Sequence, residues 1–176
     1  NFDESTAKKV HNIFGTKMRS VIHHANLAGI TDVIGQQFEI ANQILSYGLV
    51  PIIEPEISIA CPDKAEAEEI MLESLTLHLN DLKAEAKVIL KLTLPEKVNQ
   101  YASLSSHVNV MRVVALSGGY SRQEANARLS QNYAMVASFS RALSQGLSAS
   151  QSDTDFDEML ARTVQEIFTA SVSGSS

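Results

Sequence analysis

One lysine stands alone in an apolar segment of the sequence. Lys91 is the only charged residue within residues 88–94. Alternate side chains of a strand point to opposite faces, so Lys91 shares a face with Ile89 and Thr93. A buried lysine is costly unless it is paired or loses its proton, and the neutral amine is a nucleophile that forms Schiff bases with carbonyl compounds. A structural lysine paired with a carboxylate is the alternative interpretation.

Two glutamates end the preceding apolar segment. Glu54 and Glu56 lie two residues apart, so both can face Lys91 from a neighbouring strand. Two adjacent carboxylates do not both remain ionised cheaply, and one of them can therefore serve as a general acid. The alternative is an exposed acidic strand end, which suits Glu56 better than Glu54.

Two cations occupy one face of the first apolar segment. Lys17 and Arg19 are again two residues apart, and on a buried strand they would repel each other unless anions lay between them. Those anions are either Glu54 and Glu56 or a phosphate group of a substrate. A plain structural network of ion pairs is the alternative.

A glycine turn and an arginine follow the last two apolar segments. Ser117-Gly118-Gly119 precedes an expected helix. Glycines let the backbone approach a ligand closely, and the start of a helix favours an anion. Arg141 could hold a phosphate through charge-assisted hydrogen bonds. An ordinary turn and a solvated arginine are the simpler interpretations.

A metal site is not expected. His23, His24 and Cys61 are the candidate ligands, but their spacing matches no common ligand pattern.

The elements that must position these residues alternate along the chain. Short apolar runs predict strands at residues 16–22, 49–54, 87–93, 110–116 and 135–139. Ser121 opens a capping-box pattern, and the acidic residues of 153–158 suit the first turn of a last helix. A helix is also expected over residues 3–11. Three apolar stripes predict amphipathic helices: Ile34, Phe38, Ala41 and Leu45; Ala67, Met71, Leu75 and Leu79; Phe156, Leu160, Val164, Ile167 and Phe168.

Repeated strand–helix units predict an α/β fold with a parallel sheet and right-handed crossovers. Two architectures fit this pattern: an open doubly wound sheet, or part of a (β/α)8 barrel. Because the chain supplies five such units and not eight, periodicity alone favours the open sheet.

Composition limits the class of protein. The chain has 176 residues, 44% of them hydrophobic and 19% charged, with a net charge of −6. This acidic balance argues against a nucleic-acid partner, and no apolar run approaches the roughly 20 residues of a membrane-spanning helix. The single cysteine, Cys61, excludes an internal disulfide and fits a reducing compartment, so we expect a cytoplasmic protein. The chain begins at Asn1 and not at Met, which leaves an organelle as the alternative location.

Taken in order, the strand ends resemble the class I fructose-1,6-bisphosphate aldolases, in their bacterial-type branch. The motifs that carry the resemblance are residues 15–22, 48–56, 90–96, 114–121 and 137–143. The resemblance implies a (β/α)8 TIM barrel of which this chain supplies strands four to eight. Residues 1–172 would be the carboxyl-terminal part of one catalytic domain, and residues 173–176 a frayed tail. The family's first three strands, with an active-site aspartate and lysine, are missing from this sequence.

The resemblance also implies an activity, which is reversible cleavage of fructose 1,6-bisphosphate to dihydroxyacetone phosphate and glyceraldehyde 3-phosphate in glycolysis and gluconeogenesis, without a metal or other cofactor. Lys91 would form the Schiff base with dihydroxyacetone phosphate, and Glu54 would transfer protons. Glu56, Lys17 and Arg19 would shape the pocket and hold the distal part of the substrate, and the other phosphate would bind to Ser117, Gly118, Gly119, Ser138 and Arg141.

Two rival functions stay open from the sequence. The first is an inactive barrel fragment that binds a sugar phosphate or serves in an assembly, because five strands leave two open edges that invite a further chain. We expect either a homo-oligomer or contact with the missing amino-terminal part. The second is a different Schiff-base aldolase, which would need Lys91 but only one phosphate site.

Overall fold

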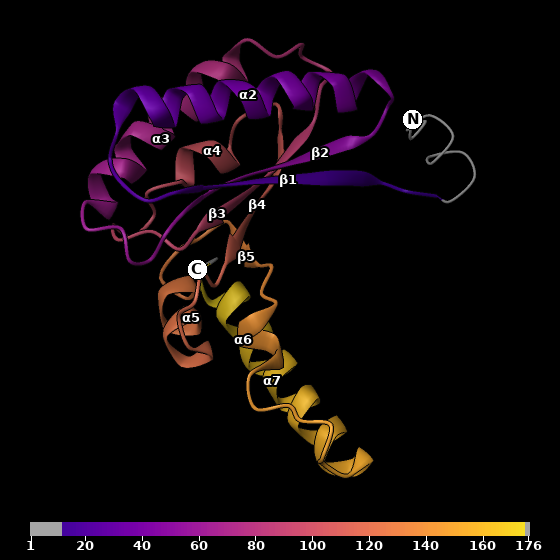
Figure 1. The fold of residues 1–176 in the computed structure, drawn as a ribbon. Helices are drawn as coiled ribbons and strands as arrows, with labels where there is room; N and C mark the ends of the chain where they lie inside the picture. The colour runs from indigo at the N-terminus through magenta and orange to yellow at the C-terminus, as the bar shows by residue number, and fades with distance from the viewer. Residues whose placement is uncertain (1–11, 175–176) are drawn as a thin grey trace.

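The computed structural model describes residues 12–174, so the helix expected over residues 3–11 lies outside the described residues. All five expected strands are present within this range (Figure 1): β1 (Gly15–Ile22), β2 (Val50–Ile57), β3 (Val88–Thr93), β4 (Val110–Leu116) and β5 (Met135–Ala137).

Two strand ends differ from expectation. Strand β2 continues to Ile57 and does not end at Glu54, so Glu56 lies within the strand. Strand β5 ends at Ala137, two residues early, although the Ser138 N–H still donates a hydrogen bond to the Ala115 carbonyl at 2.8 Å.

The strand order decides between the two architectures. The sheet runs β1-β2-β3-β4-β5, and every neighbouring pair is parallel. Right-handed crossovers that always step to the next strand in the same direction place their helices on one face of the sheet. A doubly wound sheet reverses direction and carries helices on both faces. The preference for an open doubly wound sheet, drawn from periodicity alone, is therefore wrong, and the chain forms consecutive units of a (β/α)8 barrel.

Side-chain caps fix where the long helices begin. The longest helices are α2 (Leu27–Ser46), α3 (Lys64–Asn80) and α7 (Asp153–Ser173), and shorter ones are α4 (Ala102–Ser105), α5 (Arg122–Leu129) and α6 (Arg141–Ser144). Asn26, Ser121 and Ser152 each accept a hydrogen bond from the backbone N–H three residues on, at the starts of α2, α5 and α7. Within residues 12–174 no helix is long and apolar enough to cross a membrane.

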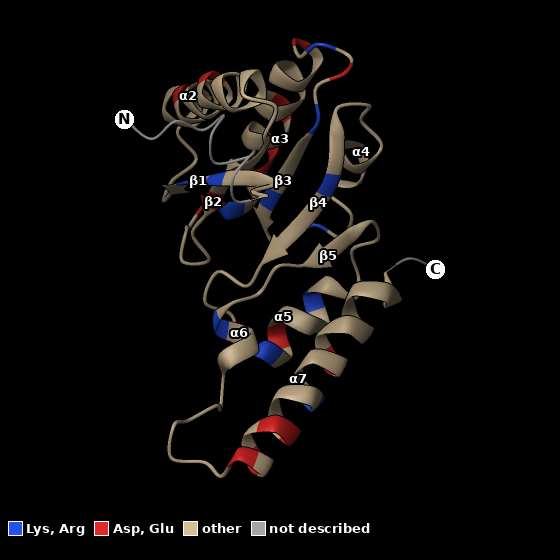
Figure 2. Ribbon diagram, turned by 90° about the vertical axis from the view of Figure 1, so that its right-hand side faces the viewer, with Lys and Arg blue, Asp and Glu red and all other residues tan. Residues whose placement is uncertain are grey.

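The sequence-based expectations for the starts of α5 and α7 and for the carboxyl-terminal tail are confirmed in part. Ser121 caps α5 as expected, but the Glu124 carboxylate pairs with Arg128, so it does not complete a capping box. Of the acidic residues expected in the first turn of α7, Asp153 and Asp155 lie there, and Figure 2 shows red segments at this end of the helix. Helix α7 includes Ser173, the first residue of the expected frayed tail, while residues 175–176 lie outside the described range.

The core lies between the sheet and the helices α2 and α3. Met71 and Leu75 of α3 are fully buried, as are Ile53, Leu90 and Val113 on the sheet face beneath the helices. Burial of one such side chain contributes about 1.5–3 kcal/mol. The first two predicted stripes therefore supply the core, as the sequence indicated.

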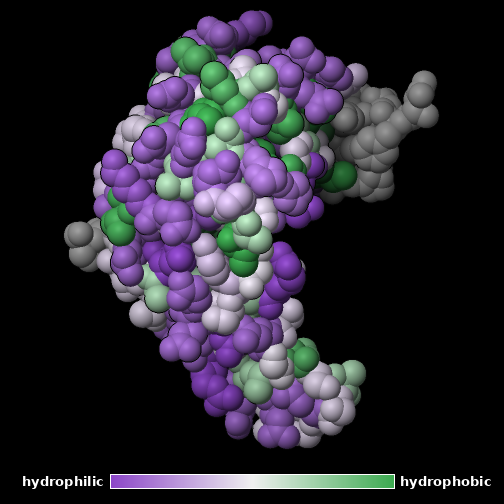
Figure 3. Space-filling model, turned by 60° about the vertical axis from the view of Figure 1, so that its left-hand side comes forward, coloured by the Kyte–Doolittle hydropathy of each residue, from purple (hydrophilic) through white to green (hydrophobic). Residues whose placement is uncertain are grey.

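The third predicted stripe is only partly correct. Ile167 is buried, but Val164 and Phe168 are 50% and 59% exposed. They line an apolar groove of about 430 Å³ between β5 and α7, which also includes Phe139 and Leu143. Figure 3 shows the surface hollowed between the region of α2 and α3 and the protruding α7. Among the described residues nothing packs against this side of α7, because the sheet stops at β5.

The groove and the open edges predict that the isolated chain self-associates. Phe168→Lys places a charge on the exposed apolar face and should lower the aggregated fraction, measured by light scattering. Leu77→Lys, at a leucine of α3 that is 67% exposed and outside the groove, should change it little. Equal effects of the two substitutions would show that the groove is not where the chain associates.

Candidate functional site

A cavity of about 380 Å³ opens on the inner face of the sheet, toward the carboxyl ends of the strands. Active sites of (β/α)8 barrels lie at this end, and the volume is in the usual range for small-molecule sites. Its lining residues are Lys17, Arg19, Glu54, Glu56, Lys91, Leu116, Ser117, Gly118, Ser138, Ser140 and Arg141.

The cavity therefore brings together every candidate residue except Gly119, which lies beside it. A Cβ atom at Gly119 would stand 3.8 Å from Arg141 Nη1. Leu116 and Ser140 also line the cavity, although the sequence interpretation gave them no role. Leu116 directly precedes Ser117, and Ser140 directly precedes Arg141. Their position at the ends of strands was therefore the feature of the sequence that could have indicated them.

Glu54 lies between two ammonium groups. Its Oε1 is 3.4 Å from Lys91 Nζ, and its Oε2 is 2.8 Å from Lys17 Nζ. A carboxylate that is only 3% exposed needs such partners, because burial of an unpaired charge is costly. The expectation that Glu54 and Lys91 share a face is confirmed. The contact fits both a structural pair and a nucleophile with its proton acceptor in reach.

Glu56 binds a different cation. The Arg19 Nε–H donates to Glu56 Oε2 at 2.8 Å, and this hydrogen bond raises the pKa of the Arg19 guanidinium. Glu56 is buried, so its interpretation as an exposed strand end is wrong, and the physical reason is that β2 continues to Ile57. Of the two kinds of anion considered for Lys17 and Arg19, the glutamates are present in the structure: Glu54 pairs with Lys17 and Glu56 with Arg19.

The glycine turn after β4 has a backbone that requires glycine. The Tyr120 N–H donates to the Ser117 carbonyl at 2.8 Å, and φ is +61° at Gly118 and +117° at Gly119. A Cβ atom at Gly118 would lie 2.8 Å from Ile59 Cγ2, closer than real Cβ contacts. The turn thus keeps its backbone against the cavity, where only glycines fit.

The charge of the cavity favours an anionic ligand. Four cations, from Lys17, Arg19, Lys91 and Arg141, face two carboxylates, although the whole chain has a net charge of −6. A concave site with such an excess of one sign attracts ligands of the opposite sign.

The cations are also spread across the sheet. Lys17 and Arg19 lie on β1, Lys91 lies on the central strand β3, and Arg141 follows β5. Neighbouring strands lie about 4.8 Å apart, so each outer set is about 10 Å from the lysine strand. This arrangement fits an elongated ligand with a carbonyl near its middle and an anionic group at each end.

Two of the three residues considered for a metal site, His24 and Cys61, lie next to Asp63. Cys61 Sγ donates to Asp63 Oδ1 at 3.0 Å, and His24 Nδ1 is 4.0 Å from the same oxygen. Burial raises the pKa of the Cys61 thiol. Within residues 12–174, no group of three or more histidine, cysteine, aspartate or glutamate side chains could hold a metal ion.

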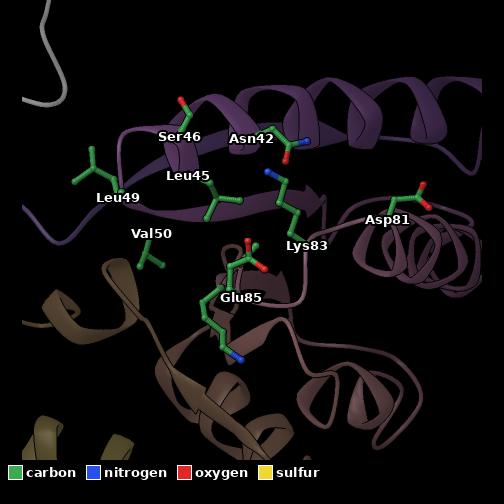
Figure 4. A pocket seen from close by; sticks show the side chains of 11 residues that line it. Asn42, Leu45, Ser46, Leu49, Val50, Asp81, Lys83 and Glu85 are labelled. Atoms are coloured by element: carbon green, nitrogen blue, oxygen red, sulfur yellow. The ribbon is translucent and has the colours of Figure 1, made fainter.

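A second cavity, of about 510 Å³, lies at the opposite end of the strands (Figure 4). It is lined by Asn42 near the end of α2, by Val50 at the start of β2, and by Lys83 and Glu85 before β3. Because function in this fold is located at the carboxyl ends of the strands, its larger volume does not identify it as the active site.

The chain is similar in sequence to curated proteins that share one name. No family model matches the chain. It is 55% identical to the class 1 fructose-bisphosphate aldolase of Synechocystis sp. over 164 residues, which are 93% of this chain and 55% of the relative. Identity to the Clostridium acetobutylicum enzyme of the same name is 51% over 173 residues, or 98% and 59% of the two chains. Identity to that of Porphyromonas gingivalis is 50% over 162 residues, or 92% and 55%.

The fold is similar to that of a crystallised fructose-bisphosphate aldolase from Plasmodium falciparum. The TM-score is 0.67 at 18% sequence identity, and the match covers 98% of this chain and 60% of that chain. Strand order and structural similarity together define part of a (β/α)8 barrel. Within that fold, the chain is homologous to the class I fructose-bisphosphate aldolases and spans 55–59% of the length of the curated relatives it matches.

The geometry of the turn predicts a specific cost for a side chain. Gly118→Ala should lower the free energy of unfolding by about 1–2 kcal/mol, because a left-handed backbone is unfavourable for alanine, and the clash with Ile59 adds to this. Gly35→Ala in α2 is the matched control, since its nearest neighbour is His78 Nε2 at 3.7 Å. That substitution should raise stability by about 0.5–1 kcal/mol. Urea denaturation measures both, and equal effects would contradict the described turn.

Proposed function

We propose that the protein of which this chain is part cleaves fructose 1,6-bisphosphate reversibly, through a Schiff base on Lys91. The observation that carries this proposal is the 3.4 Å contact between Lys91 Nζ and Glu54 Oε1, in a cavity with further cations on both sides. The identity of 50–55% to class 1 fructose-bisphosphate aldolases supports it.

The first stage joins the substrate to the enzyme. Lys91 must lose a proton before its amine attacks the carbonyl carbon, and Glu54 Oε1 is placed to accept that proton. The attack gives a carbinolamine. Glu54 then returns the proton to the carbinolamine hydroxyl, which leaves as water, and an iminium forms between Lys91 and the substrate.

The second stage breaks the carbon–carbon bond. A base removes the proton of the C4 hydroxyl, the C3–C4 bond breaks, and its electron pair moves into the iminium to give an enamine. Glyceraldehyde 3-phosphate leaves as the aldehyde. Protonation of the enamine and addition of water then release dihydroxyacetone phosphate and restore the Lys91 amine. Glu54 is the carboxylate in reach of Lys91 Nζ, and its other oxygen lies 2.8 Å from Lys17 Nζ.

Two groups of residues would hold the two phosphates. Arg141 and the turn of Ser117, Gly118 and Gly119 form one group, and Ser138 lines the same cavity. Lys17 and Arg19 form the other group, with Glu56 holding the Arg19 guanidinium. A Schiff-base aldolase that acts on a monophosphate would need only one of them, so the pair of groups favours a bisphosphate.

The rival proposal is a fragment without catalytic activity. The chain spans 55–59% of its relatives' length, and its sheet has two open edges. We infer that a segment with the first three βα units, or another copy of the chain, completes the barrel of a cytoplasmic enzyme. The chain alone should bind a sugar phosphate but not cleave it, and addition of that segment should restore cleavage. Cleavage by the chain alone would contradict this inference.

Borohydride reduction tests the role of Lys91. With dihydroxyacetone phosphate present, reduction of the Schiff base should fix the substrate carbon skeleton to Lys91, as located by peptide mass mapping. Lys91→Met should abolish trapping because the substitution removes the amine. Lys83→Met, at a lysine in the second cavity, should trap normally. An adduct on Lys17 in place of Lys91 would show the assignment to be wrong.

Proton transfer by Glu54 has its own kinetic signature. A general acid or base contributes about 10²–10⁴ to the rate, so Glu54→Gln should lower kcat by that order. Phosphate affinity at the Ser117-Gly118-Gly119 turn should change little, because Glu54 contacts Lys17 and Lys91 and not that turn. Retained kcat with lost phosphate affinity would mean that Glu54 only binds.

A further inference from the structure

Three donors converge on one carboxylate oxygen outside the cavity. Glu96 Oε1 lies 3.1 Å from Lys64 Nζ, 3.2 Å from Arg128 Nη1 and 3.3 Å from the Tyr120 hydroxyl, which donates to it. Glu96 follows the end of β3 at Thr93 by three residues. None of these four residues lines the proposed active site.

The backbone beside Glu96 is held by a buried ion pair. Lys64 and Glu68 pair within α3, with side chains 5% and 1% exposed. Lys64 Nζ also donates to the Leu94 carbonyl at 2.8 Å, and Glu68 Oε2 accepts the Glu96 N–H at 3.0 Å. A buried pair is tolerated when its remaining hydrogen-bonding capacity is satisfied, and here the backbone of residues 94–96 satisfies it. The pair thus fixes the segment that follows the Lys91 strand.

The other side of the network reaches the glycine turn. Tyr120 directly follows Gly119, and its N–H closes the turn on the Ser117 carbonyl. The Arg128 guanidinium lies 4.5 Å from the centre of the Tyr120 ring and donates to Glu124 at 2.7 Å. Tyr120 is therefore the first side chain beyond the glycines that can hold the turn.

The protonation states suit this contact at neutral pH. Partial burial acts to raise the pKa of Glu96, but the hydrogen bonds and charges of Lys64 and Arg128 outweigh it and keep the pKa below its ordinary value. Burial raises the pKa of Tyr120 to about 12. The carboxylate is thus an acceptor, and the phenol remains a donor.

We propose that Glu96 and Tyr120 are positioning residues, which fix the Ser117-Gly118-Gly119 turn relative to Lys91. This inference rests on the proposed function, in which that turn binds a phosphate while Lys91 binds the carbonyl carbon. The two adjacent glycines leave Ser117 as the one residue of the turn that has a side chain. The hydrogen bond from Tyr120 to Glu96 joins the end of the turn to the segment that the Lys64–Glu68 pair holds.

The test is made in the complete protein, with the chain joined to the segment that closes the barrel. Tyr120→Phe removes the hydroxyl and leaves the ring under Arg128. A hydrogen bond to a charged group is lost, so the Kd for inorganic phosphate, by calorimetry, should rise about threefold to tenfold. KM for fructose 1,6-bisphosphate should rise by a similar factor. The kcat, and borohydride trapping at Lys91 with saturating dihydroxyacetone phosphate, should not change, because a binding contact is weakened equally in ground and transition states. Tyr133→Phe, at an exposed tyrosine, is the matched control and should change none of these.

A double-mutant cycle separates positioning from general destabilisation. Glu96→Gln removes the charge at constant size and should raise the phosphate Kd in the same way. If the two side chains act through one hydrogen bond, Tyr120→Phe should add nothing in the Glu96→Gln protein. The midpoint of thermal unfolding checks that each variant is folded.

Unchanged phosphate affinity in Tyr120→Phe, or fully additive effects in the double variant, would overturn the positioning role. Failure of the unmutated protein to trap dihydroxyacetone phosphate would instead overturn the proposed function. The two outcomes are distinguishable, because the calorimetric comparison needs no turnover.

Discussion

The burial of Glu54 between Lys17 and Lys91 is the interaction on which the site depends. A carboxylate at 3% exposure is tolerable only with compensating charge, and its two partners come from the strands on either side. The three strands must therefore stay in one register, in which Glu54 lies opposite Arg19 of β1. If β2 slipped by one residue, Glu54 would point toward the apolar helices and away from both lysines. The same interaction thus aligns the sheet and places a proton acceptor beside the candidate nucleophile.

The one-directional sheet makes this polar inner face possible. Every crossover steps to the next strand, so the helices α2 and α3 bury the outer face, where Ile53, Leu90 and Val113 are fully enclosed. Stability comes from that side, and the inner face is left free to carry lysines, arginine and glutamates. The cost appears at the edges: β1 and β5 each lack a neighbour on one side among the described residues, and α7 exposes Val164 and Phe168.

The segment after β3 and the turn after β4 are not independent. Glu96 of that segment accepts a hydrogen bond from Tyr120, which follows the turn, and the backbone of Glu96 is held by the buried Lys64–Glu68 pair. A network of this kind fixes the position of a turn in which two of three residues are glycines. None of the residues of this network lines the cavity.

Local patterns in the sequence determined much of this protein. Short apolar runs located the five strands, and spacing of two residues placed Lys17 with Arg19 and Glu54 with Glu56 on shared faces, because a strand has a fixed two-residue period. The order of the strand-end motifs also indicated the family. The relatives that are 50–55% identical to this chain belong to the same family.

Only the tertiary structure decided which segment packs on each face of a helix or strand. Periodicity showed that Val164 and Phe168 are on an apolar stripe, but it could not show that the described chain leaves that stripe uncovered. Periodicity could not predict the burial of Glu56 either, since this burial depends on the length of β2 and on Arg19 of the neighbouring strand. The Lys64–Glu68 pair, Glu96 and Tyr120 lie in three distant segments of the sequence, and no short motif unites the three. Their meeting is a consequence of the sheet order, because contacts between distant segments are fixed by packing and not by local pattern.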